Sequence, residues 1–260
     1  MNLPEMHDRV DFWADTVKSP RYTRKQRDAA LNIAIDSFVK DRYDNIKVAD
    51  RDRVPYSFEI VERIKEELYT ITEIDYPALV VNNQTPTPPE FLYHIVSFVE
   101  VAGKRVLSIP KPYVENDLSQ NSFAKPSLDQ PVHRRTPTGF KYDVGSASIN
   151  RAFISYMKIP VQVKWNETAI TAGITVLVPG EVYYVVSGTA IQGATPHIAD
   201  TVFTSLGTGF VGTGILNKVT NCNLPVHTHE EICKIASSVL TGTFEDYNKS
   251  QKIDMESKRA

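Results

Sequence analysis

Apolar residues recur at three- and four-residue spacing through much of the first hundred positions, which predicts amphipathic helices. A first short helix is expected over residues 10–17, before Pro20. A second begins after Thr23, whose side-chain oxygen can accept from the first free N–H groups, and it runs to about Tyr43. A third is expected over residues 57–68, with acidic and basic side chains on its polar face.

The clearest helix start in the sequence is Thr87-Pro88-Pro89-Glu90. Thr87 can cap the helix, Pro88 suits its first position, and Glu90 can reach back to complete a capping box. Apolar residues follow at helical spacing: Phe91, Leu92, Ile95, Phe98 and Val99. Because Gly103 can end this helix in a left-handed turn, the pattern predicts a helical region over residues 1–103.

Beyond Lys104 the pattern changes to short runs of aromatic and β-branched residues bounded by turn residues. Strands are expected at residues 106–109, 151–165, 174–178, 181–186 and 198–203. A polar, proline-punctuated stretch from Asn116 to Gly145 is typical of a long loop, and loops of that length are tolerated where a neighbouring chain covers them. Residues 104–223 are therefore predicted to form an antiparallel sheet or small sandwich with long loops.

Helical spacing returns after Leu224-Pro225. Thr228 and Glu231 have the spacing of a second capping box, and an apolar stripe continues to about Tyr247. Residues 224–247 are expected to pack on the N-terminal helices, while the polar residues 248–260 predict a mobile tail. The fold class predicted is α+β, with a helical layer from both chain ends and a central antiparallel β-sheet or sandwich module.

Composition narrows the classes of function. The chain has 260 residues, with 29 Lys and Arg against 31 Asp and Glu, and this balance argues against affinity gained mainly from nucleic-acid phosphates. No apolar run reaches the roughly 20 residues of a membrane span, and the N-terminus does not have the pattern of a secretory signal. Two cysteines, Cys222 and Cys233, exclude a disulfide framework and favour synthesis in a reducing cytoplasm.

Residues 207–212, GTGFVG, match the letters of the dinucleotide-binding fingerprint. That chemistry requires a long helix opening at the third glycine, so that its N-terminus faces the pyrophosphate. Gly214 follows instead and disfavours a helix there. We therefore interpret the segment as a hairpin tip or a loop that contacts another subunit.

A dense set of possible metal ligands lies near the start of the last helix: His227, His229, Glu230, Glu231 and Cys233. Only His229 and Cys233 have the four-residue spacing that could share one ion on a helix. A helix cap with a small, half-buried cysteine explains the same residues. A metal-dependent hydrolase using His227, His229 and Cys233 is therefore the alternative hypothesis, and no metal or cofactor is the favoured one.

A nucleophilic active site is not evident in the sequence. Gly145-Ser146-Ala147-Ser148 is the nearest approximation to a nucleophile elbow, but it lacks the second glycine. His133 lies in a basic segment that is expected to be solvated or to meet an acidic neighbour. We therefore expect that the protein is not an enzyme.

Several short segments resemble structural proteins of crAss-like bacteriophages. Residues 118–131, LSQNSFAKPSLDQP, and residues 154–160, ISYMKIP, resemble a Lys-Pro-Ser loop and a Tyr-x-Lys/Arg-x-Pro strand of that family. Residues 224–232, LPVHTHEEI, are similar to the start of the family's last helix, and residues 22–28, YTRKQRD, to its N-terminal opening. Together the matches extend over about residues 10–247.

The resemblance implies a virion protein of the portal-to-tail region, made in the bacterial host cytoplasm and packed as a dodecameric ring in a stacked tail barrel. Its partners would be copies of itself and neighbouring portal and tail proteins, with DNA at most passing through the lumen and no membrane contact. The runner-up in the same class is a capsid-decorating or tail-fibre adaptor. Neither role implies catalysis or a cofactor.

In that setting the motif residues would be packing elements. Phe123 would be an anchor, Lys125 and Arg134 or Arg135 would pair with acidic neighbours, and His227 with His229 would form part of a helix cap. The candidate interface residues are Phe123, Lys125, Pro126, Arg134, Arg135 and Phe210.

Overall fold

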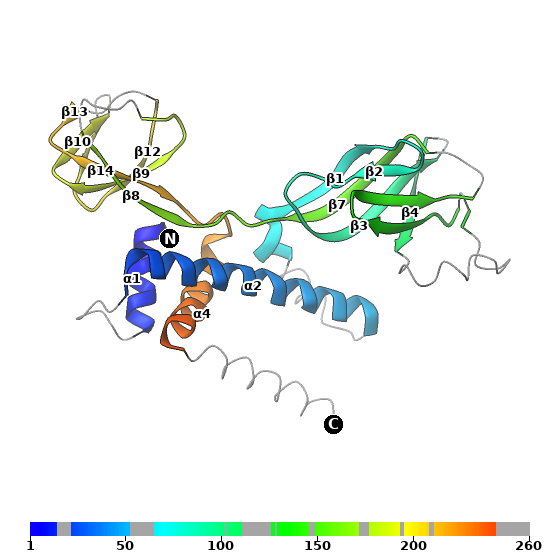
Figure 1. Ribbon diagram of the computed structural model, residues 1–260, viewed down its shortest axis with the longest axis horizontal. Helices are drawn as coiled ribbons and strands as arrows, with labels where there is room; N and C mark the ends of the chain where they lie inside the picture. Colours follow the sequence, from blue (N-terminus) through cyan, green and yellow to red (C-terminus); the bar gives the residue numbers. More distant parts are fainter. Residues whose placement is uncertain are drawn as a thin grey trace. The chain divides into compact units, whose positions relative to one another are not determined.

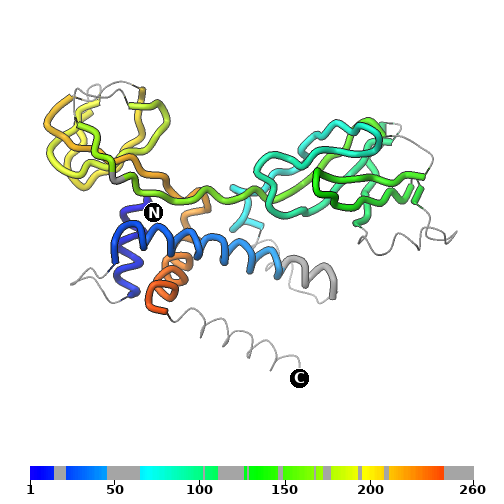
Figure 2. Tube along the Cα trace, in the orientation of Figure 1, coloured from blue at the N-terminus to red at the C-terminus, as the bar shows by residue number. Residues whose placement is uncertain are grey.

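Two groups of elements, each with its own core, make up the chain in the computed structural model (Figure 1). Unit 1 comprises residues 1–70 and 160–260, and unit 2 comprises residues 71–159. Figure 2 follows the chain from unit 1 into unit 2 and back. The residues described are 1–14, 22–52, 65–101, 103–110, 126–127, 129–145, 149–171, 177–192, 195–207 and 211–242.

Helices from both chain ends meet in unit 1. Helix α1 (Leu3–Trp13) begins at a capping box between Asn2 and Glu5. Helix α2 (Arg24–Asp52) begins after Thr23, whose hydroxyl accepts from the backbone N–H of Gln26, as predicted. Helix α4 (His229–Thr241) packs against both α1 and α2. The predicted α+β class, with one helical layer from the two chain ends, is confirmed.

The predicted helix bounds need correction in three places. The first helix begins and ends earlier than residues 10–17, because the capping box at Asn2 fixes its start. Helix α2 continues past Tyr43 to Asp52. The predicted capping box of Thr228 is wrong, because its hydroxyl donates to the Pro225 carbonyl at 2.8 Å. The Thr228 N–H donates to the same oxygen and closes a 3₁₀ turn, η3 (Val226–Thr228).

Arg42 joins three segments of unit 1. Its Nε donates to Glu67 at 2.6 Å, and its Nη2 donates to both oxygens of Glu231 at 2.8 and 2.9 Å. Its guanidinium also lies 4.6 Å from the ring centre of Phe38. Glu67 is buried, so this pair fixes the segment before unit 2 against α2 and α4 more firmly than an exposed pair would.

Two small antiparallel sheets complete unit 1 and share one core. The four-stranded sheet has the order β12 (Val202–Thr204), β9 (Val182–Ser187), β14 (Ile215–Thr220), β8 (Lys164–Thr171). The three-stranded sheet has the order β11 (Thr195–Ile198), β10 (Thr189–Gln192), β13 (Val211–Gly212). Gly188, at φ +72°, turns the chain from β9 into β10, and a Cβ there would lie 2.7 Å from the Thr213 carbonyl oxygen.

Unit 2 is a curled seven-stranded sheet. Its order is β1 (Thr72–Leu79), β7 (Arg151–Lys158), β3 (Phe91–Val101), β4 (Lys104–Pro110), β5 (Val132–Thr136), β6 (Gly139–Asp143), β2 (Gln84–Pro86). A tight turn with a Val81–Gln84 bridge joins β1 directly to β2, the two ends of this order. The interior is filled by residues of β1, β3, β6 and β7, including Tyr142, Ile154 and Tyr156. All pairs are antiparallel except β4 with β5.

The predicted helix over residues 87–103 is wrong, because this segment contains strand β3. Glu90 has φ +53°, a left-handed conformation that cannot be the third residue of a helix. The apolar residues chosen for helical spacing are interleaved with Tyr93, Val96 and Val101, which are strong strand formers. Pairing with β4 and β7 on both sides then determines the structure.

The predicted domain boundaries change accordingly. The helical region does not extend to residue 103, and the β-rich part is not continuous over 104–223, because residues 71–159 and 160–223 belong to different units. The loop predicted over residues 116–145 contains the hairpin β5–β6. Most of the predicted helix at 57–68 lies outside the described residues, although residues 65–68 are helical. The predicted strand at 174–178 and the tail at 248–260 fall largely or wholly outside them too.

A buried carboxylate connects the helices of unit 1 to its sheets. Asp28 of α2 bonds to His7 Nε2 of α1 at 2.8 Å, and its other oxygen accepts from the Trp165 backbone N–H of β8, also at 2.8 Å. The Trp165 ring stacks on His7 and has the Arg24 guanidinium 4.3 Å from its centre. One residue of α2 therefore satisfies polar groups from a second helix and from one strand.

Asp28→Ala is expected to lower the free energy of unfolding of unit 1 by about 3 kcal/mol, because it leaves two buried donors without an acceptor. Urea unfolding followed by tryptophan fluorescence measures it, since both tryptophans, Trp13 and Trp165, lie in unit 1. Asp44→Ala, an exposed position on the same helix, is the control and should change stability by less than about 0.5 kcal/mol. Equal effects of the two substitutions would contradict the assignment.

Candidate functional site

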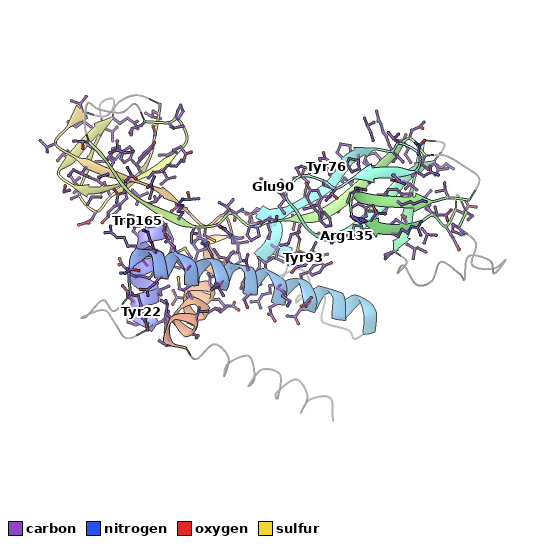
Figure 3. All side chains as sticks on the ribbon, in the orientation of Figure 1. Tyr22, Tyr76, Glu90, Tyr93, Arg135 and Trp165 are labelled. Atoms are coloured by element: carbon purple, nitrogen blue, oxygen red, sulfur yellow. The ribbon has the colours of Figure 1, made fainter. Side chains whose placement is uncertain are left out.

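The interface residues predicted from sequence lie apart or outside the described part of the chain. Phe123, Lys125 and Phe210 are not among the described residues. Pro126 is half-buried, and its carbonyl oxygen lies against the backbone of Gly145. Arg134 is half-buried on β5, and the exposed Arg135 places its guanidinium 4.8 Å from the ring centre of Phe91 (Figure 3).

His229 and Cys233, at the start of α4, serve packing. His229 is buried and its Nε2 donates to the Leu224 carbonyl at 2.8 Å, while Cys233 is buried with its Sγ 3.6 Å from the Met6 carbonyl oxygen. His227 is exposed. Burial raises the pKa of Cys233 to about 12, which disfavours the thiolate that a metal requires. No group of three metal-ligating side chains occurs in the described parts of the chain.

The glycine-rich segment at residues 207–212 does not open a helix. Residues 208–210 lie outside the described chain, and β13 and β14 follow them. Val211 pairs with Ile191 of β10, so the described end of the segment belongs to a sheet. The flanking strands β12 and β13 belong to different sheets, so the predicted hairpin tip is not supported, while a loop that contacts another subunit stays a prediction. The helix that dinucleotide binding requires after the third glycine is replaced by strand β14.

Unit 2 contains a cluster of polar side chains that the sequence did not reveal. His133 Nδ1 hydrogen-bonds Ser108 Oγ at 3.0 Å, and His94 Nε2 hydrogen-bonds Ser97 Oγ at 2.8 Å. The two imidazole rings lie 4.7 Å apart, centre to centre. Ser97, Ser108 and His133 are all buried, so His133 is not the solvated loop residue that was predicted.

A β-bulge assembles this cluster. His94 pairs with Tyr156 and Val96 with Ser155, so two steps along β3 match one step along β7. In a regular strand, residues three apart face opposite sides, but the bulge lets His94 contact Ser97 on one side. The sequence signal for this cluster was the presence of two polar residues, His94 and Ser97, in an otherwise apolar strand. The interpretation of residues 87–103 as a helix prevented its recognition.

Burial determines the electrostatics of the cluster. It lowers the pKa of His133 from 6.5 to about 4, and the bond with Ser108 opposes this only in part. Burial also raises the pKa of Tyr142, and the neighbouring hydroxyls of Ser97 and Thr85 oppose this shift only in part. His133 is therefore neutral at pH 7, and Ser97 and Ser108, which bond to the two imidazoles, are buried. The arrangement stabilises an interior and does not form an accessible active site.

Comparison with known proteins gives no family for this chain: it matches no protein-family model and no curated protein. In the described part of the chain, no helix is long and apolar enough to cross a membrane.

Acidification is expected to destabilise unit 2 through His133. The unfolded chain binds more protons than the folded one between pH 6.5 and about 4, so stability is full above pH 6.5 and falls as the pH drops through this window. The loss between pH 7 and pH 5 should be about 2 kcal/mol. Native-state hydrogen exchange of the β5 and β6 amides, corrected for intrinsic rates, measures it.

His133→Gln should remove most of this pH dependence, because glutamine does not titrate. His227→Gln, at an exposed position in unit 1, should retain it. A pH slope that is unchanged in His133→Gln would show that other groups cause it.

Proposed function

We propose that this chain is a virion structural protein, a subunit of a dodecameric ring in the connector or tail barrel of a crAss-like bacteriophage, where it joins portal to tail. The sequence resemblance supplies the family, and the distribution of apolar surface supports a role in assembly. The protein would be made in the bacterial cytoplasm and reside in the virion.

The observation that supports the proposal is that apolar side chains lie next to one another across several strands on an exposed sheet face. In unit 2, Leu107, Phe98, Phe153 and Pro77 lie in register across β4, β3, β7 and β1. Leu107 and Pro77 are exposed, and Phe98 and Phe153 are half-buried. Exposed apolar residues that occur singly are ordinary, whereas rows across several strands are typical of surfaces that contact other proteins.

The polar clusters described above connect elements within each unit. The His94–Ser97 and His133–Ser108 pairs are inside unit 2, and the Asp28 and Arg42 contacts hold elements of unit 1 together. This distribution favours a structural subunit over the hydrolase alternative, since a hydrolase needs polar groups that converge on an accessible site.

The nearly balanced charge of the chain is compatible with an assembly of many copies. With a net charge of −2, neighbouring subunits in a ring repel one another weakly. A lumen without strong positive charge also lets DNA pass without being retained.

Purified full-length protein, alone or with an adjacent virion protein, is expected to form closed rings in negative-stain images. Rings of this protein alone should have a mass by light scattering that is a fixed multiple of 29.2 kDa. Discrete assemblies without ring closure would favour a capsid or tail-fibre adaptor instead. A stable monomer that carries stoichiometric zinc and loses it on His229→Ala would contradict the proposal and support the hydrolase.

A further inference from the structure

Strand β4 of unit 2 is paired along its whole length on one side but hardly at all on the other. Its residues 104–108 pair with β3 in unbroken antiparallel register. On the other side, β5 pairs with it only at Ile109 and Pro110. We call the remaining part of that side, along residues 104–108, the open edge.

The open edge presents backbone hydrogen-bonding groups of two residues. The Ile109 N–H donates to the Pro131 carbonyl at 2.9 Å, so it points away from β3. Bonding directions alternate along an antiparallel strand, and the N–H and C=O groups of Arg105 and Leu107 therefore also point away from β3. In the described part of the chain, no group bonds to them on that side.

Most other edge strands in the described sheets are blocked by proline or are very short. A proline, which has no N–H to donate, lies in three of them: Pro77 of β1, Pro86 of β2 and Pro196 of β11. Strands β12 and β13 have three and two residues. Such features prevent the addition of a further strand to a sheet.

The remaining edge strand, β8, is covered by a helix. The Asp28 and Asn32 side chains of α2 accept from the N–H groups of Trp165 and Val163, both at 2.8 Å. Among the described strands, the open edge of β4 therefore differs from all others, because it has no proline within residues 104–108 and no side chain bonded to it.

The side chains along the open edge limit which strand can be added. Lys104 and Arg105 are exposed, and Arg105 pairs with Asp75 at 2.6 Å, whereas Lys104 has no ion pair among the described residues. Like charges on adjacent strands repel each other, so an acidic strand fits here and a basic one does not. Leu107 is exposed at the end of the apolar row of unit 2, and an aliphatic side chain beside it would continue that row.

We infer that the open edge binds an extended acidic segment of a different polypeptide, which adds to unit 2 as a further strand. The backbone groups of Arg105 and Leu107 supply the hydrogen bonds, and Leu107 and Lys104 select the side chains. A second copy of this chain is the poorer partner for two reasons. Its own open edge would bring the same basic residues, and every described strand is already paired in its own sheet. The inference goes beyond the proposed ring and does not depend on it.

Amide hydrogen exchange of the full chain, measured by NMR with and without a capped peptide of sequence TETVTET, tests the inference. The Arg105 and Leu107 amides should exchange rapidly in the free protein and at least about tenfold more slowly with excess peptide, because the peptide carbonyls then accept from them. The peptide TKTVTKT should bind at least about tenfold more weakly, since its lysines meet Lys104 and Arg105.

Leu107→Pro should abolish binding of TETVTET, because it removes one outward N–H and leaves those that pair with β3 intact. Leu107→Ala is the matched control, which keeps the N–H and should still slow exchange at Arg105. Protection of the β3 and β7 amides checks that unit 2 remains folded. If Leu107→Pro loses that protection, Arg105→Pro repeats the test at the other outward N–H, with Arg105→Ala as its control.

Four outcomes would overturn the inference. Slow exchange of both amides in the free protein would mean that the edge is already covered, and TETVTET could also fail to bind at millimolar concentration. Equal binding of the two peptides would contradict the selection of an acidic strand. Equal binding by the proline variant and its alanine control would show that the backbone edge is not the contact. None of these results bears on the ring, which the images of the purified protein decide.

Discussion

The Asp28 carboxylate is the interaction on which the architecture of unit 1 depends. Its two oxygens hold an imidazole from α1 and a backbone N–H from β8 while it sits on α2 itself. Burying a carboxylate is costly unless all its partners are in place, so this bond specifies one arrangement of helices and sheets. The Arg42 contacts with Glu67 and Glu231 then fix α4 and the segment before unit 2 against the same helix. The helical layer is therefore held in one arrangement against the sheets of unit 1.

Local signals predicted the elements whose ends are fixed locally. Thr23 caps α2, and the apolar stripe before Phe244 is helical in α4 as far as Thr241, so the helical layer and the α+β class were accessible from sequence. The segment at residues 87–103 was not, because its spacing suits both a helix and a strand and long-range pairing with β4 and β7 decides between them. Thr228 likewise had the spacing of a cap but bonds to Pro225 instead. In both cases, the spacing of residue types along the sequence does not determine the structure by itself.

The candidate sites, too, could be predicted only in part from local sequence signals. The cluster of His94 and His133 depends on a bulge and on strands far apart in sequence, and no motif encodes it. The ligand-like spacing of His229 and Cys233 was visible, but only their burial shows that packing uses them.

A structural subunit of a phage connector has to be present in the particle, in many copies around one axis. The most direct test of that claim is a cryo-EM reconstruction of the purified virion of the phage whose genome encodes this chain. The account predicts density for the helical layer of α1, α2 and α4, for the two small sheets of unit 1 and for the seven-stranded sheet of unit 2. This density should be repeated in a ring between portal and tail. The absence of this fold from the reconstruction, together with the absence of its peptides from the purified particle, would contradict the account.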